Sequence, residues 1–239
     1  MSDPLRIALV VEGPTDFVLI QSVLGQVLGE KPFIARILQP EQSLVFGPTG
    51  TGWGGVYRWC RQKSKEYGRL SQNRMIFGNF DILIIHLDAD VAGKKYADVL
   101  KKDESPYPTD GALPCAVACP CHADETLVRT CHALRNVLLS WCHETAMPPN
   151  TVICMPSQNM ETWVMAAFFP GDKEMSRFGF ECHPDPETRI GQQKKDMRFA
   201  KNVRDYQARA DEFAARWPAV TALCSRAGVF DGDLRSVLR

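Results

Sequence analysis

Two aspartates one residue apart, Asp88 and Asp90, follow a short, largely apolar run at residues 82–87 that is rich in β-branched residues. The run is too short for a typical helix and indicates a strand buried on both faces. In open α/β sheets the functional crevice lies at the carboxyl ends of such strands. Residues i and i+2 of an extended chain share a face, so the two carboxylates would repel each other unless a cation lay between them. Hard oxygen ligands suit Mg²⁺ or Mn²⁺, so the pair predicts a divalent-metal site; an Asp-rich turn is the alternative.

A second acidic strand end lies near the N-terminus. Residues 5–11 form another short aliphatic run, which ends in Glu12 and a Gly-Pro turn. Asp16 then adds negative charge where a helix dipole favours it, and the apolar spacing over 17–28 predicts the helix itself. If the two strands are neighbours in a parallel sheet, Glu12 and the aspartate pair face one crevice.

This order of motifs resembles the Toprim domain, the compact α/β metal-binding fold of topoisomerases, bacterial primases, recombination-repair proteins and nucleases of the overcoming-lysogenization-defect class. The matching residues are Val-Glu-Gly-Pro-Thr-Asp at 11–16 and Asp-Ala-Asp at 88–90. The Glu-Thr-Trp at 161–163 also resembles a Glu-x-Trp helix start in small stand-alone Toprim-like proteins, several of which are encoded in bacterial anti-phage loci. The resemblance covers most of residues 5–168.

The resemblance implies roles for individual residues. Glu12 would be an acid/base group or metal ligand, and Asp88 and Asp90 would hold magnesium. Glu161 would be a direct or outer ligand of the metal, although a glutamate near a helix start also has a plainer role in stabilising the helix. Either Glu12 or Asp16 could position or deprotonate a water molecule. A lysine downstream of the acidic motifs would assist the site, and the candidates are Lys194, Lys195 and Lys201.

Strand-like and helix-like segments alternate over most of the chain, which predicts an α/β fold with a parallel sheet flanked by helices. We expect a Toprim-like core over 1–169, with an irregular insertion at about 91–123, followed by a linker and a basic helical extension at 170–239. Ser157 is the expected N-cap of the last core helix. The expected strands are 5–11, 32–38, 82–87 and 151–155, and the expected helices are 17–28, 55–67, 124–145, 158–168 and 219–227.

Basic residues near these motifs predict contacts with nucleic acid. Lys94 and Lys95 follow the aspartate pair closely. Lys195, Arg198 and Arg204 lie in a basic segment with interleaved aromatic residues, which is typical of a surface that tracks a nucleic-acid backbone. A solvated amphipathic helix is the alternative.

A Gly-rich loop at 47–55 could cradle phosphate through its backbone N–H groups. It lacks the Gly-Lys-Ser/Thr ending of a P-loop, which excludes a P-loop ATPase, and we expect a loop or lid beside the crevice. The helix that follows carries Arg58, Arg61, Lys63 and Lys65, which form a solvated face unless some of the arginines touch phosphate.

Composition limits the remaining possibilities. The 239-residue chain has 28 basic and 28 acidic residues, which argues against a globally basic nucleic-acid coat but not against a local basic groove. The nine cysteines, without a secretory signal, indicate free thiols in a soluble cytoplasmic protein, and no segment has the apolar length of a membrane span. Cys and His cluster at 115–122, but their spacing matches no zinc knuckle, so we do not expect a structural zinc ion.

These features predict a Mg²⁺- or Mn²⁺-dependent phosphodiesterase, a nuclease acting on DNA or RNA; the resemblance adds a setting in anti-phage defence. One alternative is a non-catalytic regulatory subunit that partners a separate defence ATPase. Another is a small-molecule phosphotransferase that binds a nucleotide at the Gly-rich loop. A homo-oligomer is left open.

Overall fold

A four-stranded, all-parallel sheet forms the centre of the protein. The computed structural model describes residues 3–41, 49–102, 104–115, 124–195 and 200–238. The strands lie in the order β2-β1-β3-β4, and they span β1 Leu5–Val10, β2 Phe33–Gln39, β3 Ile82–His86 and β4 Thr151–Cys154. The predicted α/β fold is confirmed, and so is the expected neighbourhood of the two acidic strand ends, because β1 pairs with β3 in parallel from Ile7↔Ile82 to Val10↔Ile85.

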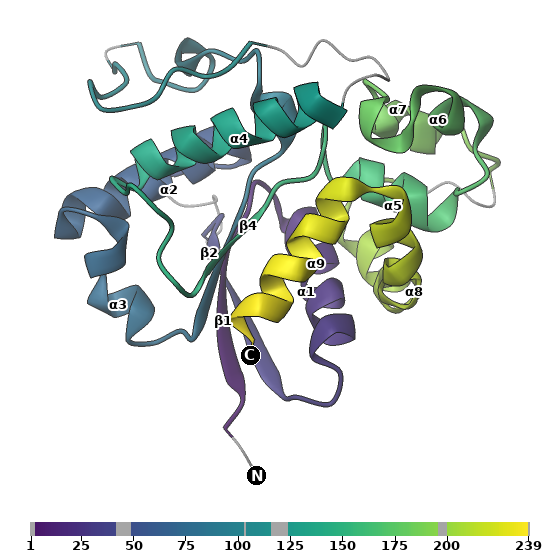
Figure 1. Cartoon of the computed structure of the whole chain (residues 1–239), viewed down its shortest axis with the longest axis horizontal. Coiled ribbons are helices and arrows are strands. Elements are labelled where there is room, and N and C mark those ends of the chain that lie inside the picture. The colour runs from purple at the N-terminus through teal and green to yellow at the C-terminus, as the bar shows by residue number, and fades with distance from the viewer. Residues whose placement is uncertain (1–2, 42–48, 103, 116–123, 196–199, 239) are drawn as a thin grey trace.

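Helices cover both faces of the sheet (Figure 1). Side chains alternate along each strand, so Ile7 and Leu9 of β1 pack on one face and Ala8 and Val10 on the other. The first face meets α1 Pro14–Leu28, α5 Glu161–Phe168, α8 Val203–Leu223 and α9 Ser225–Val237. The second face meets α2 Gly52–Tyr67 and α4 Asp124–Trp141. The remaining short helical segments are η1 Leu70–Gln72, α3 Arg74–Phe77, η2 Ala89–Val91, η3 Tyr96–Asp98, α6 Lys173–Phe178, η4 Phe180–Cys182 and α7 Pro186–Gly191.

The start of α5 differs from the sequence expectation. The helix begins at Glu161, and Ser157 does not cap it; the Ser157 hydroxyl is buried without a hydrogen-bond partner among the described residues. The reason is that this segment continues the pairing beyond the sheet, since Ala89 N donates to Pro156 O at 3.0 Å and Asp90 N donates to Gln158 O at 2.9 Å. These hydrogen bonds hold the segment before α5 against the residues that follow β3, and Gln158 has a φ of 57°, so the helix does not begin where the sequence pattern placed it.

The C-terminal part of the chain is more regular than expected. The segment expected as a linker contains α6, η4 and the start of α7, and the helix expected at 219–227 is replaced by α8 and α9, which meet at Cys224. Phe213 and Trp217 of α8 and Phe230 of α9 are almost fully buried and belong to the same hydrophobic cluster as β1 and α1. These helices therefore complete the layer that covers one face of the sheet. Within the described residues, we find no helix with the length and apolar character needed to cross a membrane.

Candidate metal centre

Glu12, His86 and Asp88 converge at the carboxyl edge of the sheet. Each offers one ligand atom, and the three atoms lie within 4.8 Å of one another. Glu12 follows β1, His86 ends β3, and Asp88 lies two residues beyond it. Because β1 and β3 are paired in register, their C-terminal residues must emerge side by side.

Backbone hydrogen bonds hold the first strand end in place. Glu12 Oε1 accepts a hydrogen bond from Asp88 N at 2.8 Å, which ties the two strand ends together. The carbonyl oxygen of Glu12 accepts from Gly52 N, also at 2.8 Å, where α2 begins. Gly52 has a φ of 67°, in the left-handed region that favours glycine. The Gly-rich segment therefore supports the site through the backbone.

His86 is a site residue that the sequence analysis did not single out. Its side chain is fully buried, and Nε2 lies 3.0 Å from Asp88 Oδ1. On its other side, Nδ1 lies 3.8 Å from Asp16 Oδ2 and has no hydrogen-bond partner among the described residues. The signal was present in the sequence, since His86 precedes Asp88 by two positions and so shares its face of the strand.

Asp16 lies at the start of α1, beside the metal-binding group. Its carboxylate is buried and accepts a hydrogen bond from Gly13 N at 2.8 Å, so it stabilises the helix start. The same oxygen, Oδ2, faces His86. In this arrangement Asp16 stabilises the start of α1 and faces the imidazole; nothing in its contacts assigns it the catalytic role that the sequence suggested.

The carboxylates raise one another's pKa. The pKa of Glu12 lies well above its usual value because burial disfavours the charged form and Asp88 repels it. The pKa of Asp88 is raised well above normal by burial and by the charges of Asp16, Asp90 and Glu161. Burial also raises the pKa of Asp90, although Lys94 and Lys201 oppose that shift. A divalent cation would relieve this repulsion.

Glu161 connects the acidic group to the C-terminal half of the chain. Its side chain is fully buried, and it accepts hydrogen bonds from Tyr206 Oη at 2.9 Å and from Lys201 Nζ at 3.0 Å. Lys201 Nζ also lies 3.2 Å from Glu187 Oε2. Burial opposes the charge on Lys201, but its two glutamate partners raise its pKa above the usual value, so it remains an ammonium ion. One of the predicted downstream lysines thus lies at the site.

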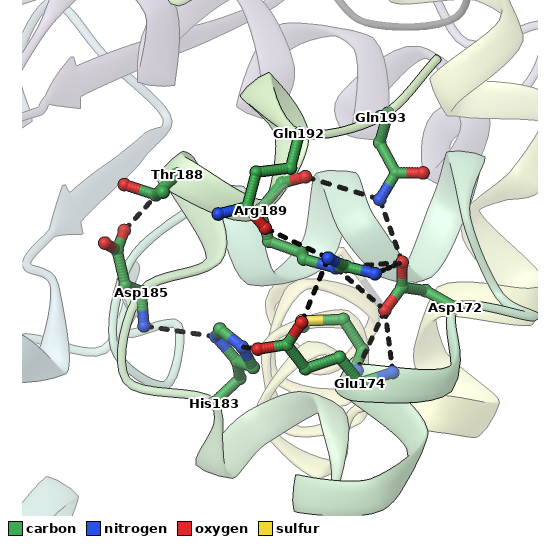
Figure 2. Close-up of polar contacts among 9 residues, drawn as sticks. Asp172, Glu174, His183, Asp185, Thr188, Arg189, Gln192 and Gln193 are labelled. Atoms are coloured by element: carbon green, nitrogen blue, oxygen red, sulfur yellow. Dashed lines mark hydrogen bonds and ion pairs between the residues drawn. The ribbon is translucent and has the colours of Figure 1, made fainter.

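A polar network behind Lys201 positions Glu187. Glu187 lies on α7, and Figure 2 shows how Arg189 of the same helix is held by Asp172 and Glu174 at the start of α6. Arg189 Nη2 lies 2.9 Å from Asp172 Oδ2, and Arg189 Nη1 lies 3.0 Å from Glu174 Oε2. Asp172 Oδ1 also caps α6 by accepting from Glu174 N and Met175 N, each at 3.0 Å. The network therefore fixes α7, which in turn presents Glu187 to Lys201.

The other basic candidates are at the surface. Lys94 lies close enough to Asp90 to lower its pKa, and Lys95, Lys194, Lys195 and Arg204 are exposed. Arg198 lies outside the described residues, as do Cys119, Cys121 and His122. Of the other cysteines, Cys131 and Cys142 are buried free thiols on or just after α4.

The donor set fits a hard or borderline divalent cation. Two carboxylates suit Mg²⁺ or Mn²⁺, and an imidazole nitrogen additionally suits Mn²⁺ and Zn²⁺, so the residues do not select a single metal. Asp90, the second carboxylate of the predicted pair, raises the pKa of Asp88, and so does Glu161. The three ligand atoms that converge, however, come from Glu12, His86 and Asp88. No protein-family model, no curated protein and no solved structure matches this chain.

Proposed function

We propose that this protein is a divalent-metal-dependent phosphodiesterase that cleaves nucleic acid. The observation that supports the proposal most strongly is the convergence of Glu12, His86 and Asp88 within 4.8 Å at the carboxyl edge of a parallel sheet. Three further carboxylates, those of Asp16, Asp90 and Glu161, lie close enough to raise the pKa of Asp88. Asp16 also raises the pKa of Glu12 and of Glu161. Such a concentration of buried negative charge is costly without a cation.

A bound Mg²⁺ or Mn²⁺ would polarise a phosphodiester and lower the pKa of a water molecule. Glu12 and Asp88 would hold the ion, with His86 as a third ligand or as the group that orients Asp88. A carboxylate beside the bound water, such as that of Glu12, would accept the proton that the water loses.

Lys201 would supply positive charge to the phosphate. Its ammonium group acts on both Asp88 and Asp90, and 35% of its side chain is exposed. A phosphate oxygen at the site could therefore reach Lys201 while Glu161 keeps the amine oriented. Lys94, which also lowers the pKa of Asp90, would add to the field that attracts a polyanion.

The proposed setting in anti-phage defence, with or without an ATPase partner, rests on the Toprim resemblance of the motifs at 11–16 and 88–90. The regulatory alternative uses the same acidic group as a scaffold: Glu12 and Glu161 are both tied to other parts of the chain by hydrogen bonds, as structural residues would be. The two functions differ in what the carboxylates must do, so a carboxylate variant separates them.

The test is cleavage of labelled single-stranded and double-stranded DNA and RNA with Mg²⁺ or Mn²⁺, comparing the wild type with Asp88→Asn. We expect metal-dependent cleavage by the wild type and a loss of at least about 100-fold in the variant, because Asn has no charge to hold the ion. Asp211→Asn is the matched control: Asp211 is exposed on α8, and its loss should leave the rate unchanged.

Metal binding, measured by calorimetry on the same proteins, separates the outcomes. Binding that disappears in Asp88→Asn without any cleavage by the wild type would support the scaffold function and contradict the phosphodiesterase. Equal cleavage by both proteins would place the active site elsewhere.

A further inference from the structure

A cavity of about 360 Å³ lies between the outer face of α2 and the segment that follows η3. Five of its lining residues, Tyr57, Arg58, Arg61, Gln62 and Lys65, come from α2. Their spacing of one, three and four residues places them on one side of a helix. Tyr107, Leu100 and Glu104 belong to the opposite wall. The volume falls in the range of small-molecule sites in proteins.

Arg61 and Tyr107 form the rigid part of the cavity wall. The Arg61 guanidinium lies 3.7 Å from the centre of the Tyr107 ring, and only 6% of the Arg61 side chain is exposed. Asp110 neutralises this arginine: its Oδ1 lies 3.1 Å from Arg61 Nη1. Asp110 Oδ2 accepts hydrogen bonds from Tyr57 Oη at 2.8 Å and from Tyr107 N at 2.9 Å, so the ring is anchored by its own backbone.

Tyr107 offers a free aromatic surface. One face of its ring is covered by Arg61, yet 43% of the residue is exposed, and Tyr107 lines the cavity. An exposed tyrosine held in place from behind loses little conformational freedom when a flat ligand stacks on it. Nucleobases stack well on such rings, and the stacking tolerates any base.

Arg58 and Lys65 provide positive charge at the same cavity. Arg58 donates from Nε to Thr49 O and from Nη1 to Val99 O, both at 2.8 Å, so the groups that hold it carry no compensating charge. Its Nη2 has no hydrogen-bond partner in the described part of the chain. Lys65, one and a half to two turns further along α2, is exposed and forms no ion pair with a described residue. The acid that faces them is Glu104, whose Oε2 accepts from Lys101 N at 3.0 Å.

We propose that this cavity binds a nucleoside phosphate, with the base stacked on Tyr107 and the phosphate held by Arg58 and Lys65. Arg61 and Asp110 cancel each other's charge, and Glu104 offsets one of the two remaining cations, so the cavity has a net charge of one positive unit. A preorganised guanidinium with a free donor suits a phosphate oxygen. The Tyr107 ring, with Leu100 on the same wall, suits the base.

The cavity is separate from the metal centre. The α2 backbone touches Glu12 at Gly52, whereas Arg58 and Lys65 lie 6 and 13 residues further along the helix, which is about 9 and 20 Å at the rise of an α-helix. Nucleotide binding here therefore does not require a metal ion and does not depend on the proposed phosphodiesterase activity.

The test is calorimetric titration of the full chain in excess EDTA with the 5′-monophosphates of adenosine and uridine, the matching nucleosides, and inorganic phosphate. We expect the monophosphates to bind at least about 10-fold more tightly than either the nucleosides or phosphate alone, because both halves of the cavity contribute. The same affinity is expected in Asp88→Asn, which removes the metal centre but not the cavity. If a tetranucleotide binds more tightly than the monophosphate, the ligand is a nucleotide within a nucleic-acid strand. If the tetranucleotide and the monophosphate bind with equal affinity, the ligand is a free nucleotide. Both results support the proposal.

Two variants locate the binding. Tyr107→Leu keeps an apolar side chain but removes the ring, and we expect about 10-fold weaker binding of the monophosphate. Because the Lys65 side chain is exposed, Lys65→Gln should fold normally. We expect it to bind the monophosphate about 3- to 10-fold more weakly. Lys63→Gln is the matched control, since Lys63 is on the same helix, pairs with Glu66 and does not line the cavity. No binding, unchanged affinity in both variants, or phosphate binding as tightly as the nucleotide would overturn the proposal.

Discussion

His86 changes what the acidic group can bind. A site of carboxylates alone favours Mg²⁺, whereas a buried imidazole beside Asp88 adds a nitrogen donor that suits Mn²⁺ and Zn²⁺ better. The same imidazole also connects Asp88 to Asp16, because its two nitrogens face the two carboxylates. At the scale of single residues, the metal selectivity of the candidate centre would therefore depend on a residue inside the strand as well as on the acids that follow it.

Replacing His86 by Asn should weaken Mn²⁺ binding by about 10- to 100-fold, the cost usually seen when a ligand or its supporting partner is removed. Mg²⁺ binding should fall less, because Mg²⁺ gains little from nitrogen ligands. Calorimetry with both metals measures the difference. His132→Asn, an exposed histidine on α4, is the control. An unchanged Mn²⁺ affinity would show that His86 serves the fold and not the metal.

Two short helices, α6 and α7, are held together by the charge on Asp172. Its carboxylate caps α6 and accepts hydrogen bonds from Arg189 and Gln193 (Figure 2). Burial alone would raise the pKa of Asp172, but the hydrogen bonds from Arg189, Met175 N and Gln193 lower it from 3.8 to about 2. At the scale of elements, this ion pair positions α7 and, through Glu187, the lysine at the metal centre.

Asp172→Asn should lower the free energy of unfolding by about 2 kcal/mol at neutral pH, which corresponds to the shift in pKa. Because the folded-state pKa is depressed, this stabilisation is present above about pH 4 and is lost as the pH falls towards 2. The difference between wild type and variant should therefore shrink over that window when urea unfolding is measured at several pH values.

Asp185→Asn is the matched control for this prediction. Asp185 caps α7 by accepting from Thr188 N but forms no ion pair with an arginine among the described residues. Asn is as good an N-cap as Asp, so Asp185→Asn should lower the free energy of unfolding much less than Asp172→Asn does. A difference for Asp172→Asn that does not change with pH would mean that the lost geometry, rather than the lost charge, is responsible.

The candidate metal centre and its surroundings take residues from both halves of the chain. Glu12 follows β1 and Asp16 lies at the start of α1, whereas Lys201 lies just before α8 and Tyr206 lies in its first turns. Their contacts with one another or with Glu161 bring the two halves together at one edge of the sheet. At the scale of the molecule, charge in this group should influence the stability of the whole fold.

Metal binding should therefore stabilise the protein in a pH-dependent way. The pKa values of Glu12, Asp88 and Asp90 are raised, so the native protein binds more protons than the unfolded chain above the ordinary pKa of a carboxyl group, and its stability in EDTA should fall as the pH rises. Mn²⁺ at about 100 times its Kd should add about 2.7 kcal/mol, or about 5 to 10 °C in Tm, at pH 8. The gain should be smaller at pH 5, where protons compete with the ion.

Differential scanning calorimetry at pH 5 and 8, with Mn²⁺ or EDTA, measures both effects. Asp88→Asn should lose the response to Mn²⁺ and should itself be less sensitive to pH in EDTA. A metal-induced rise in Tm that is equal at both pH values would contradict the assignment of these carboxylates as ligands.

The sequence patterns were sufficient to predict the parallel sheet and the edge of the sheet at which Glu12 and Asp88 meet. Aliphatic runs that end in Glu12 and Asp88 predict buried strands, and a parallel sheet necessarily brings such ends to one edge; β1 and β3 are indeed neighbours. The start of α5 was predicted wrongly because Pro156 and Gln158 bond to the segment after β3. That pairing joins residues far apart in the sequence, so no local pattern could reveal it.

Local features could be predicted from the sequence: the strand periodicity, the acidic turns that follow the strands, and the presence of the helices that pack on the sheet. What only the tertiary structure decided is which distant groups reach those turns. Lys201 was one of three candidate lysines until the fold placed it on Glu161, and Arg61, Asp110 and Tyr107 form a cavity wall only because α2 packs against a segment some 45 residues further along. The physical reason is that burial and charge pairing act through space, where the sequence separation of the partners has no influence on the energy.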